Sequence, residues 1–124
     1  MQIERRKFPR VKLKYKITVM CEGKVLLGAP EGFVFHTFSE DLSQAGVMVK
    51  LEQQLENASI VKLKLFITEK FPFECKGSVI WTRKANPEGT KPDIFETGIK
   101  FMSLDGIELK LIGNLVRSFI KPLA

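Results

Sequence analysis

The chain has 124 residues, the length of one domain, and 44% of them are hydrophobic, as in ordinary globular cores. Its ten phenylalanines and many β-branched residues argue against disorder. No stretch approaches the roughly 18 unbroken apolar residues of a membrane-spanning helix, and no apolar signal-peptide core follows the basic N-terminus. We therefore expect a cytoplasmic protein with no membrane span.

Cysteine and histidine are scarce. Cys21 and Cys75 stand far apart in the chain, and His36 is the only histidine. In a reducing compartment we expect both thiols to be reduced and to pack as small buried hydrophobes. These three residues lack the spacing of a metal site, so we predict no metal ion.

The positive charge is concentrated at the N-terminus. Residues 1–16 hold seven bases and one acid, whereas the remaining 108 residues hold thirteen of each. The formal net charge of +6 therefore lies entirely on the first segment. Such a localised field attracts phosphate groups, although a solvated basic tail is the simpler interpretation of charge alone.

Alternation with a period of two predicts that most of the chain forms β-strands. Over residues 11–19, one face carries five apolar side chains, namely Val11, Leu13, Tyr15, Ile17 and Val19. Further strands are expected over 24–28, 33–39, 47–51, 59–68, 73–84 and 93–102, and a hairpin loop is expected over 85–92. Many short strands at close spacing favour a small antiparallel barrel or sandwich.

The C-terminal stretch changes to helical spacing. Its apolar stripe consists of Ile107, Leu111, Leu115 and Phe119, widened by Ile112, Val116 and Ile120. Asp105 and Glu108 are spaced as a capping box, and Pro122 ends the predicted helix. We expect the stripe to cover an open end or side of the barrel. The alternative is a dimer or partner surface.

Two short motifs carry the functional interpretation. In "RRKFPR", Arg6 and Arg10 stand four residues apart, and Arg5 precedes them directly. In "DLSQAG", an acid, a hydroxyl and a glycine stand at fixed spacing, namely Asp41, Ser43 and Gly46. Either motif alone is weak, but their order and their separation by about one hairpin are informative.

These residue types suit a guanine nucleotide. A guanidinium donates in a rigid fork to phosphate oxygens or to the O6/N7 edge of guanine, and it can stack on a purine. A carboxylate such as Asp41 only accepts hydrogen bonds, so it complements the N–H donors of guanine's Watson–Crick edge. Ser43 can bond a phosphate or a base edge, and Gly46 permits a tight turn. A Walker-type motif is absent, so nucleotide hydrolysis is not indicated.

In this order the motifs resemble those of the PilZ family of bacterial cyclic di-GMP receptors. "RRKFPR" resembles its Arg-x-x-x-Arg motif, "DLSQAG" resembles its Asp/Asn-x-Ser-x-x-Gly motif, and "GSVIWTRK" and "FETGIKF" resemble its later strands. The resemblance covers about residues 4–120. It implies a mainly β fold, a six-stranded antiparallel β-barrel of the split type with a C-terminal α-helix. A single domain, 1–124, would then comprise a flexible basic arm (1–14), the barrel (15–102) and the helix (104–121).

The resemblance also implies a binding site. The ligand-binding residues that it implies are Arg5, Arg6, Arg10, Asp41, Ser43 and Gly46. The arginines would clasp guanine and phosphate, and the second motif would bind a guanine edge and shape the turn. An arginine directly before the first motif, here Arg5, implies two stacked, intercalated ligand molecules.

The expected function is a non-catalytic cyclic di-GMP receptor that signals in trans to an effector protein of motility, pili or exopolysaccharide control. It would need no cofactor and would be a monomer or a homodimer. One alternative is a single-stranded nucleic-acid-binding barrel, which the neutral remainder of the chain disfavours. Another is an adaptor that does not need the ligand. Trp81 is interpreted as barrel wall or core, with ligand stacking as the less favoured role.

Overall fold

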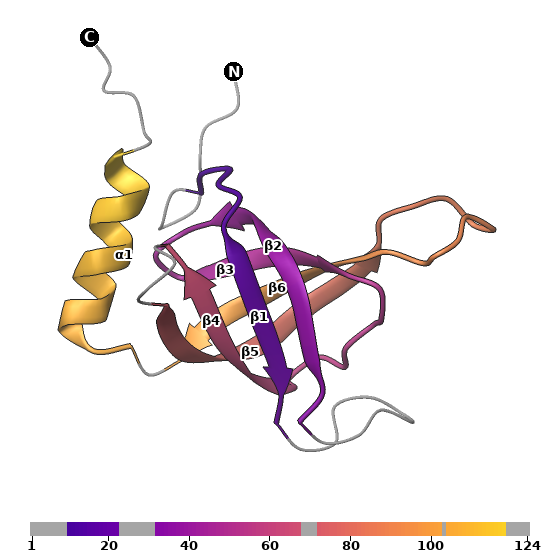
Figure 1. Cartoon of the computed structure of the whole chain (residues 1–124), viewed down its shortest axis with the longest axis horizontal. Coiled ribbons are helices and arrows are strands. Elements are labelled where there is room, and N and C mark those ends of the chain that lie inside the picture. The colour runs from indigo at the N-terminus through magenta and orange to yellow at the C-terminus, as the bar shows by residue number, and fades with distance from the viewer. Residues whose placement is uncertain (1–9, 23–31, 68–71, 103, 119–124) are drawn as a thin grey trace, which may run out of the picture.

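The computed structural model describes residues 10–22, 32–67, 72–102 and 104–118. The elements in chain order are β1 (Lys16–Cys21), β2 (Val34–Leu42), β3 (Gly46–Leu51), β4 (Ile60–Phe66), β5 (Phe73–Lys84), β6 (Phe95–Met102) and α1 (Gly106–Ser118). All strand pairs are antiparallel, and the order β1-β2-β3-β6-β5-β4 closes on itself as a barrel (Figure 1). The predicted six-stranded antiparallel barrel with a C-terminal helix is therefore confirmed.

Every second side chain of the strands points inward, and these side chains fill the interior of the barrel. In β4, Val61, Leu63 and Leu65 are buried, while the lysines between them are exposed. In β1, Ile17 and Val19 are buried as predicted. Burial of one such side chain stabilises the fold by about 1.5–3 kcal/mol. Because these side chains fill the interior, a ligand has to bind on the outer surface of the barrel.

The chain enters the barrel through residues 11–15, which the sequence predicts as the start of the first strand. Here the buried side chain of Ser39 replaces part of the strand ladder. Its hydroxyl accepts a hydrogen bond from the Tyr15 N–H at 2.9 Å and donates one to the Leu13 carbonyl. Because a side chain makes these hydrogen bonds, β1 begins at Lys16 rather than at residue 11.

The segment between β2 and β3 is shorter than predicted. Asp41 and Leu42 extend β2, although the sequence predicts that they break the strand pattern. A bulge between Ser39 and Asp41 shifts the register and lets the pairing with β3 continue. The turn is thereby reduced to three residues before Gly46 begins β3. The strand predicted over 24–28 lies outside the described residues.

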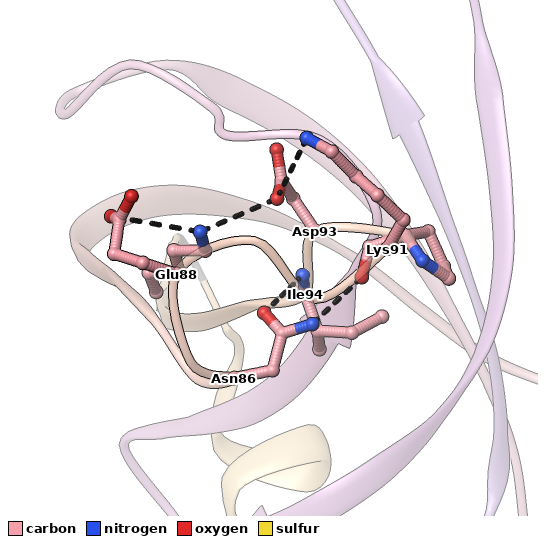
Figure 2. Close-up of polar contacts among 7 residues, drawn as sticks. Asn86, Glu88, Lys91, Asp93 and Ile94 are labelled. Atoms are coloured by element: carbon pink, nitrogen blue, oxygen red, sulfur yellow. Dashed lines mark hydrogen bonds and ion pairs between the residues drawn. The ribbon is translucent and has the colours of Figure 1, made fainter.

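The loop between β5 and β6 projects from the barrel (Figure 1) and is fastened by its own polar contacts (Figure 2). The Asn86 side chain donates to the Pro92 carbonyl at 2.7 Å and accepts from the Ile94 N–H at 3.0 Å. Because Asn86 holds the N–H of Ile94, β6 begins at Phe95 rather than at residue 93. The predicted hairpin loop over 85–92 is confirmed.

The helix α1 begins with the predicted capping box. The Glu108 N–H donates to Oδ1 of Asp105 at 2.7 Å, and the Asp105 N–H donates to Oε1 of Glu108 at 3.2 Å. These reciprocal bonds satisfy two N–H groups that a helix start otherwise leaves unpaired. Within the described part of the chain, no helix is long and apolar enough to cross a membrane.

The apolar stripe of α1 is divided between the core and the surface. Ile112 and Val116 are buried and join the barrel core, and Leu115 packs partly against it. Ile107 and Leu111 are 81% and 51% exposed. The stripe is wider than the arc of a helix that can touch a convex barrel wall. The prediction that the stripe covers the barrel is therefore wrong for Ile107 and Leu111, and its members Phe119 and Ile120 lie outside the described residues.

Candidate ligand-binding site

A pocket of about 260 Å³ opens on the outer side of the barrel, where the β2–β3 turn meets β5 and β6. It contains four of the six predicted site residues, namely Arg10, Asp41, Ser43 and Gly46. The rest of its lining comes mainly from Met48, Ile80, Trp81, Gly98 and Lys100. Arg5 and Arg6 lie outside the described residues. The described parts of the two motifs therefore meet at one pocket, and their roles in binding stay predictions.

A short β-bridge brings Arg10 to this pocket. The Val11 N–H donates to the Leu42 carbonyl at 2.9 Å, and the Leu42 N–H donates to the Val11 carbonyl at 2.8 Å. Because the bridge is antiparallel, Arg10 comes opposite Ser43 at the start of the turn. Arg10 is exposed, and the backbone bridge of its neighbour Val11 holds it beside the turn.

Ser43 builds the turn of the second motif. Its hydroxyl oxygen accepts hydrogen bonds from the N–H groups of Ala45 at 3.1 Å and Gly46 at 3.2 Å. Its own N–H donates to the Gly46 carbonyl at 2.9 Å. Ser43 as a whole is only 8% exposed. Most of the hydrogen-bonding capacity of its hydroxyl therefore serves the turn. The serine therefore positions Asp41, which precedes it at the end of β2.

The side chain of Gln44 ties this turn to the helix. Its Nε2 donates to the Leu109 carbonyl at 2.8 Å. The contact is close at Gly113 as well, where an added Cβ would lie 2.9 Å from the same Nε2. Gln44, a position to which the motif assigns no role, thus links α1 to the turn that lines the pocket.

Gly46 is required by strand packing rather than by a left-handed turn. It is the first residue of β3 and pairs with Lys100 of β6. A Cβ at this position would lie 2.2 Å from the carbonyl oxygen of Ile99, which is far inside van der Waals contact. Because that neighbour is backbone, it cannot move aside. The glycine therefore lets β6 approach the turn closely. As a result, Gly98 and Lys100 of β6 line the same pocket as Asp41.

Trp81 forms one wall of the pocket, although the motifs did not predict it as a site residue. A bulge between Val79 and Trp81 shifts the register of β5 against β6. Val79 stays in the core, and the bulge places Ile80 and Trp81 together on the outer surface, where both line the pocket. Trp81 is therefore outer barrel wall. The family-like stretch "GSVIWTRK" was the one signal in the sequence for this residue. The bulge itself could not be predicted, because it is a register shift between two strands.

The indole of Trp81 lies across Gly98. In the strand register Gly98 stands between Trp81 of β5 and Met48 of β3. A Cβ at Gly98 would lie 2.3 Å from the indole Nε1 and 2.4 Å from Cε2. Arg83 contacts the same ring, since its guanidinium lies 5.6 Å from the ring centroid, and it binds Glu96 at 3.2 and 3.4 Å.

The chemistry of the pocket is that of a site for a planar, anionic molecule with hydrogen-bond donors. Trp81 offers an aromatic surface for stacking, and Asp41 offers acceptor oxygens. Arg10 and Lys100 supply positive charge at the rim. Among the described residues, no group of three histidine, cysteine or acidic side chains is placed to hold a metal ion.

These features define a closed β-barrel with a pocket on its outer wall that carries both charged and aromatic side chains. The PilZ domain family model matches residues 4–118, nearly the whole chain. The chain therefore belongs to the PilZ domain family, and the resemblance carried by the two motifs is confirmed.

Solved structures of PilZ proteins share the fold at low identity. The PilZ domain of YcgR from Escherichia coli with c-di-GMP is 12% identical, with a TM-score of 0.70 over 93% of this chain and 91% of that domain. MotI/DgrA, an inhibitor of motility from Bacillus subtilis, is 12% identical, with a TM-score of 0.70 over 94% of this chain. The MrkH–c-di-GMP complex of K. pneumonia is 14% identical, with a TM-score of 0.68 over 94% of this chain.

The matched share of these proteins differs. The chain spans about half of MotI/DgrA (51%) and of MrkH (52%). A comparison with curated protein sequences finds no significant match. The structural likeness thus shows the fold, and the family model shows the family.

Proposed function

We propose that the chain is a non-catalytic receptor for cyclic di-GMP. The observation that carries this proposal is the convergence on one pocket of a carboxylate, two cations and an aromatic ring, from Asp41, Arg10, Lys100 and Trp81. Membership of the PilZ family supports the same ligand, as do the c-di-GMP complexes of YcgR and MrkH.

Each described group has a complement on the ligand. The Asp41 carboxylate accepts hydrogen bonds from the N1–H and N2–H₂ donors of guanine, which adenine does not offer. Trp81 stacks on the base, an interaction that contributes about 1–3 kcal/mol per base. Arg10 and Lys100 pair with the phosphates. Ser43 and Gly46 act through the turn that presents the carboxylate.

The size of the pocket supports a role for the N-terminal arm. A volume of about 260 Å³ is below the roughly 300–1,000 Å³ of pockets that enclose a drug-sized ligand. A cyclic dinucleotide would therefore be covered only in part by the described residues. Arg5 and Arg6 of the predicted arm would complete the site by closing over the ligand. Arg5 also favours two stacked ligand molecules rather than one.

The proposal assigns no chemical step to the pocket. The Ser43 hydroxyl is engaged by turn amides, and among the described residues no hydrogen bond joins it to the Asp41 carboxylate or to any other basic side chain. Binding would instead order the arm against the barrel and change the surface offered to an effector protein in trans. The ligand would thus act by shifting the population of arm conformations.

The test is isothermal titration of cyclic di-GMP into the whole chain, with cyclic di-AMP and GTP as comparison ligands. Selective binding of cyclic di-GMP is expected, and Arg10→Ala and Asp41→Ala should each weaken it by about 1–3 kcal/mol. Lys110→Ala, an exposed change on α1, is the matched control and should leave the affinity unchanged. A stoichiometry near two would support the stacked pair.

Other outcomes would favour other functions. Equal binding of both cyclic dinucleotides would contradict the role of Asp41. Tight, salt-dependent binding of oligothymidine without binding of cyclic di-GMP would favour the single-stranded nucleic-acid barrel. Binding of no nucleotide at all would leave the ligand-independent adaptor.

A further inference from the structure

A second groove lies on the side of the barrel opposite the ligand pocket. It has a volume of about 560 Å³ and runs over the outer surface of β1 and β2 toward β4. In the closed strand order, β1 is three strands from β6 in either direction, so this groove and the pocket on β5 and β6 face away from each other. Figure 1 shows β1 and β2 in front of β5 and β6.

Large apolar side chains stand on this surface in register with basic ones. Phe38 of β2 and Phe66 of β4 both pair with Lys16 of β1, so a lysine stands between two aromatic rings. Phe38 is 51% exposed. The next outward rows across the strands are His36, Thr18, Lys64 and Glu74, followed by Val34, Met20, Lys62 and Lys76. We call this surface the β1–β2–β4 face. Exposed apolar groups clustered in this way are typical of interaction surfaces.

The ion pairs on the β1–β2–β4 face are weak and open to exchange. Lys62 and Lys76 share Glu22 at 3.6 Å each, and Lys64 lies 3.4 Å from Glu74. The three lysine side chains are more than half exposed, so each pair contributes little to stability. With Lys16 included, the described residues of the face carry four lysines and two glutamates. The face is therefore apolar and net positive.

We infer that the β1–β2–β4 face is a docking surface for an acidic protein segment that also carries aromatic or aliphatic side chains. Its apolar side chains would fill the groove beside Phe38 and Phe66, and its carboxylates would replace the weak internal pairs of the lysines. Because the barrel is closed, such a segment binds through side chains and adds no strand. The inference rests on the proposed function in that it gives the receptor a place to hold its effector in both the free and the bound state, while the arm and pocket respond to the ligand on the other side.

The charges favour an acidic protein over two other occupants. A nucleic-acid backbone would meet the carboxylates of Glu22 and Glu74, which stand among the lysines. A second copy of the chain would present the same net positive face and be repelled in a symmetric dimer. A segment with spaced carboxylates matches both the lysines and the apolar groove.

The experiment measures fluorescence anisotropy of a labelled acidic peptide in which aspartate and glutamate alternate with phenylalanine and leucine. The comparison probes are a peptide with the apolar residues changed to serine, a basic peptide of the same pattern, and oligothymidine. Phe38→Ser and Lys64→Glu are expected to weaken binding of the acidic peptide by about tenfold or more. Leu111→Ser and Lys110→Glu on α1 are the matched controls, because Leu111 is also 51% exposed. They should change the affinity by less than about twofold.

The same samples are titrated with cyclic di-GMP, which separates the two hypotheses. Peptide binding that persists at saturating cyclic di-GMP is expected, since the two surfaces face away from each other. Displacement by the ligand, equal weakening by the α1 controls, or no binding at millimolar peptide would overturn the inference. Preference for oligothymidine, or a dimer that Phe38→Ser dissociates, would assign the face to another occupant. Loss of cyclic di-GMP binding alone would contradict only the proposed function.

Discussion

The indole ring of Trp81 occupies the space that any side chain at Gly98 would need. A Cβ at that position would lie 2.3 Å from Nε1 and 2.9 Å from Cδ1 of the ring. The two residues face each other across β5 and β6 because the bulge after Val79 turns Trp81 outward. A glycine in one strand therefore sets the position of the aromatic wall in the other.

Gly98→Ala is expected to displace the indole from the strand surface and to weaken the binding of cyclic di-GMP. Overpacking of this kind costs about 1–3 kcal/mol. Trp81 is the only tryptophan, so tryptophan emission, excited selectively over tyrosine, reports this ring alone. We expect a shifted emission maximum and a lower melting temperature. Gly106→Ala is the control, because nothing lies within 4 Å of its added Cβ. An unchanged spectrum for Gly98→Ala would contradict the close contact.

Ser39→Ala is expected to loosen the segment that leads from Arg10 to β1. Ser39 is fully buried, and its hydroxyl serves both the Tyr15 N–H and the Leu13 carbonyl. Its removal leaves these buried backbone groups partly unpaired, which costs about 1–3 kcal/mol. Urea denaturation measures the loss of stability, and hydrogen exchange at the Tyr15 amide should become faster. Ser118→Ala, an exposed change, is the control. Equal effects of both changes would argue against the bridging role.

Much of the barrel could be predicted because its determinants are local. The alternation in β4 and the capping box at Asp105 and Glu108 depend on residues within a few positions of one another. The two bulges could not be predicted in this way. Each is a mismatch between partner strands, and the bulge in β5 decides that Trp81 belongs to the pocket. The motif predicted Ser43 as a ligand contact, which stays a prediction, and the folded turn shows that its hydroxyl also accepts hydrogen bonds from the Ala45 and Gly46 N–H groups.

The Cys75 thiol is expected to be unreactive at neutral pH. Burial, and secondarily the negative charge of Glu108, raise its pKa to about 12. The unfolded thiol has a pKa of about 8.5, so at pH 8 the native thiolate fraction is lower by on the order of a thousandfold. Alkylation by iodoacetamide, followed by peptide mass mapping, should be correspondingly slow in the native chain and fast in urea.

The same shift makes stability depend on alkaline pH. Because the folded pKa of Cys75 lies above the unfolded one, the native state holds its proton more tightly. The contribution of Cys75 to the free energy of unfolding is fully present below the unfolded pKa of about 8.5. It declines as the pH rises toward the folded pKa of about 12. Cys75→Ser should flatten this decline in urea midpoints measured across alkaline pH. An equally steep decline in the variant would assign it to other groups.

Asp93 should titrate below the usual range of an aspartate. Partial desolvation raises the pKa of its carboxyl, but the hydrogen bond and charge of Lys84, together with Lys91, outweigh that effect and lower the pKa. Oδ1 of Asp93 lies 3.4 Å from Nζ of Lys84 and 3.5 Å from Nζ of Lys91. Figure 2 shows the contact with Lys91. Their stabilising effect is present above the unfolded pKa of about 3.9 and is lost as pH falls through the lower folded pKa.

Carboxyl carbon NMR across acidic pH gives the Asp93 titration directly. Lys84→Ala should raise the pKa of Asp93 more than Lys91→Ala does, because the hydrogen bond and charge of Lys84 act more strongly on it. Lys110→Ala, on α1, should leave it unchanged. High salt should raise the pKa in the unaltered chain, since exposed pairs are screened. If the Asp93 pKa stayed depressed in both loop variants, the lysines would not be its cause, and the backbone of the Asn86 loop would have to hold the charge instead.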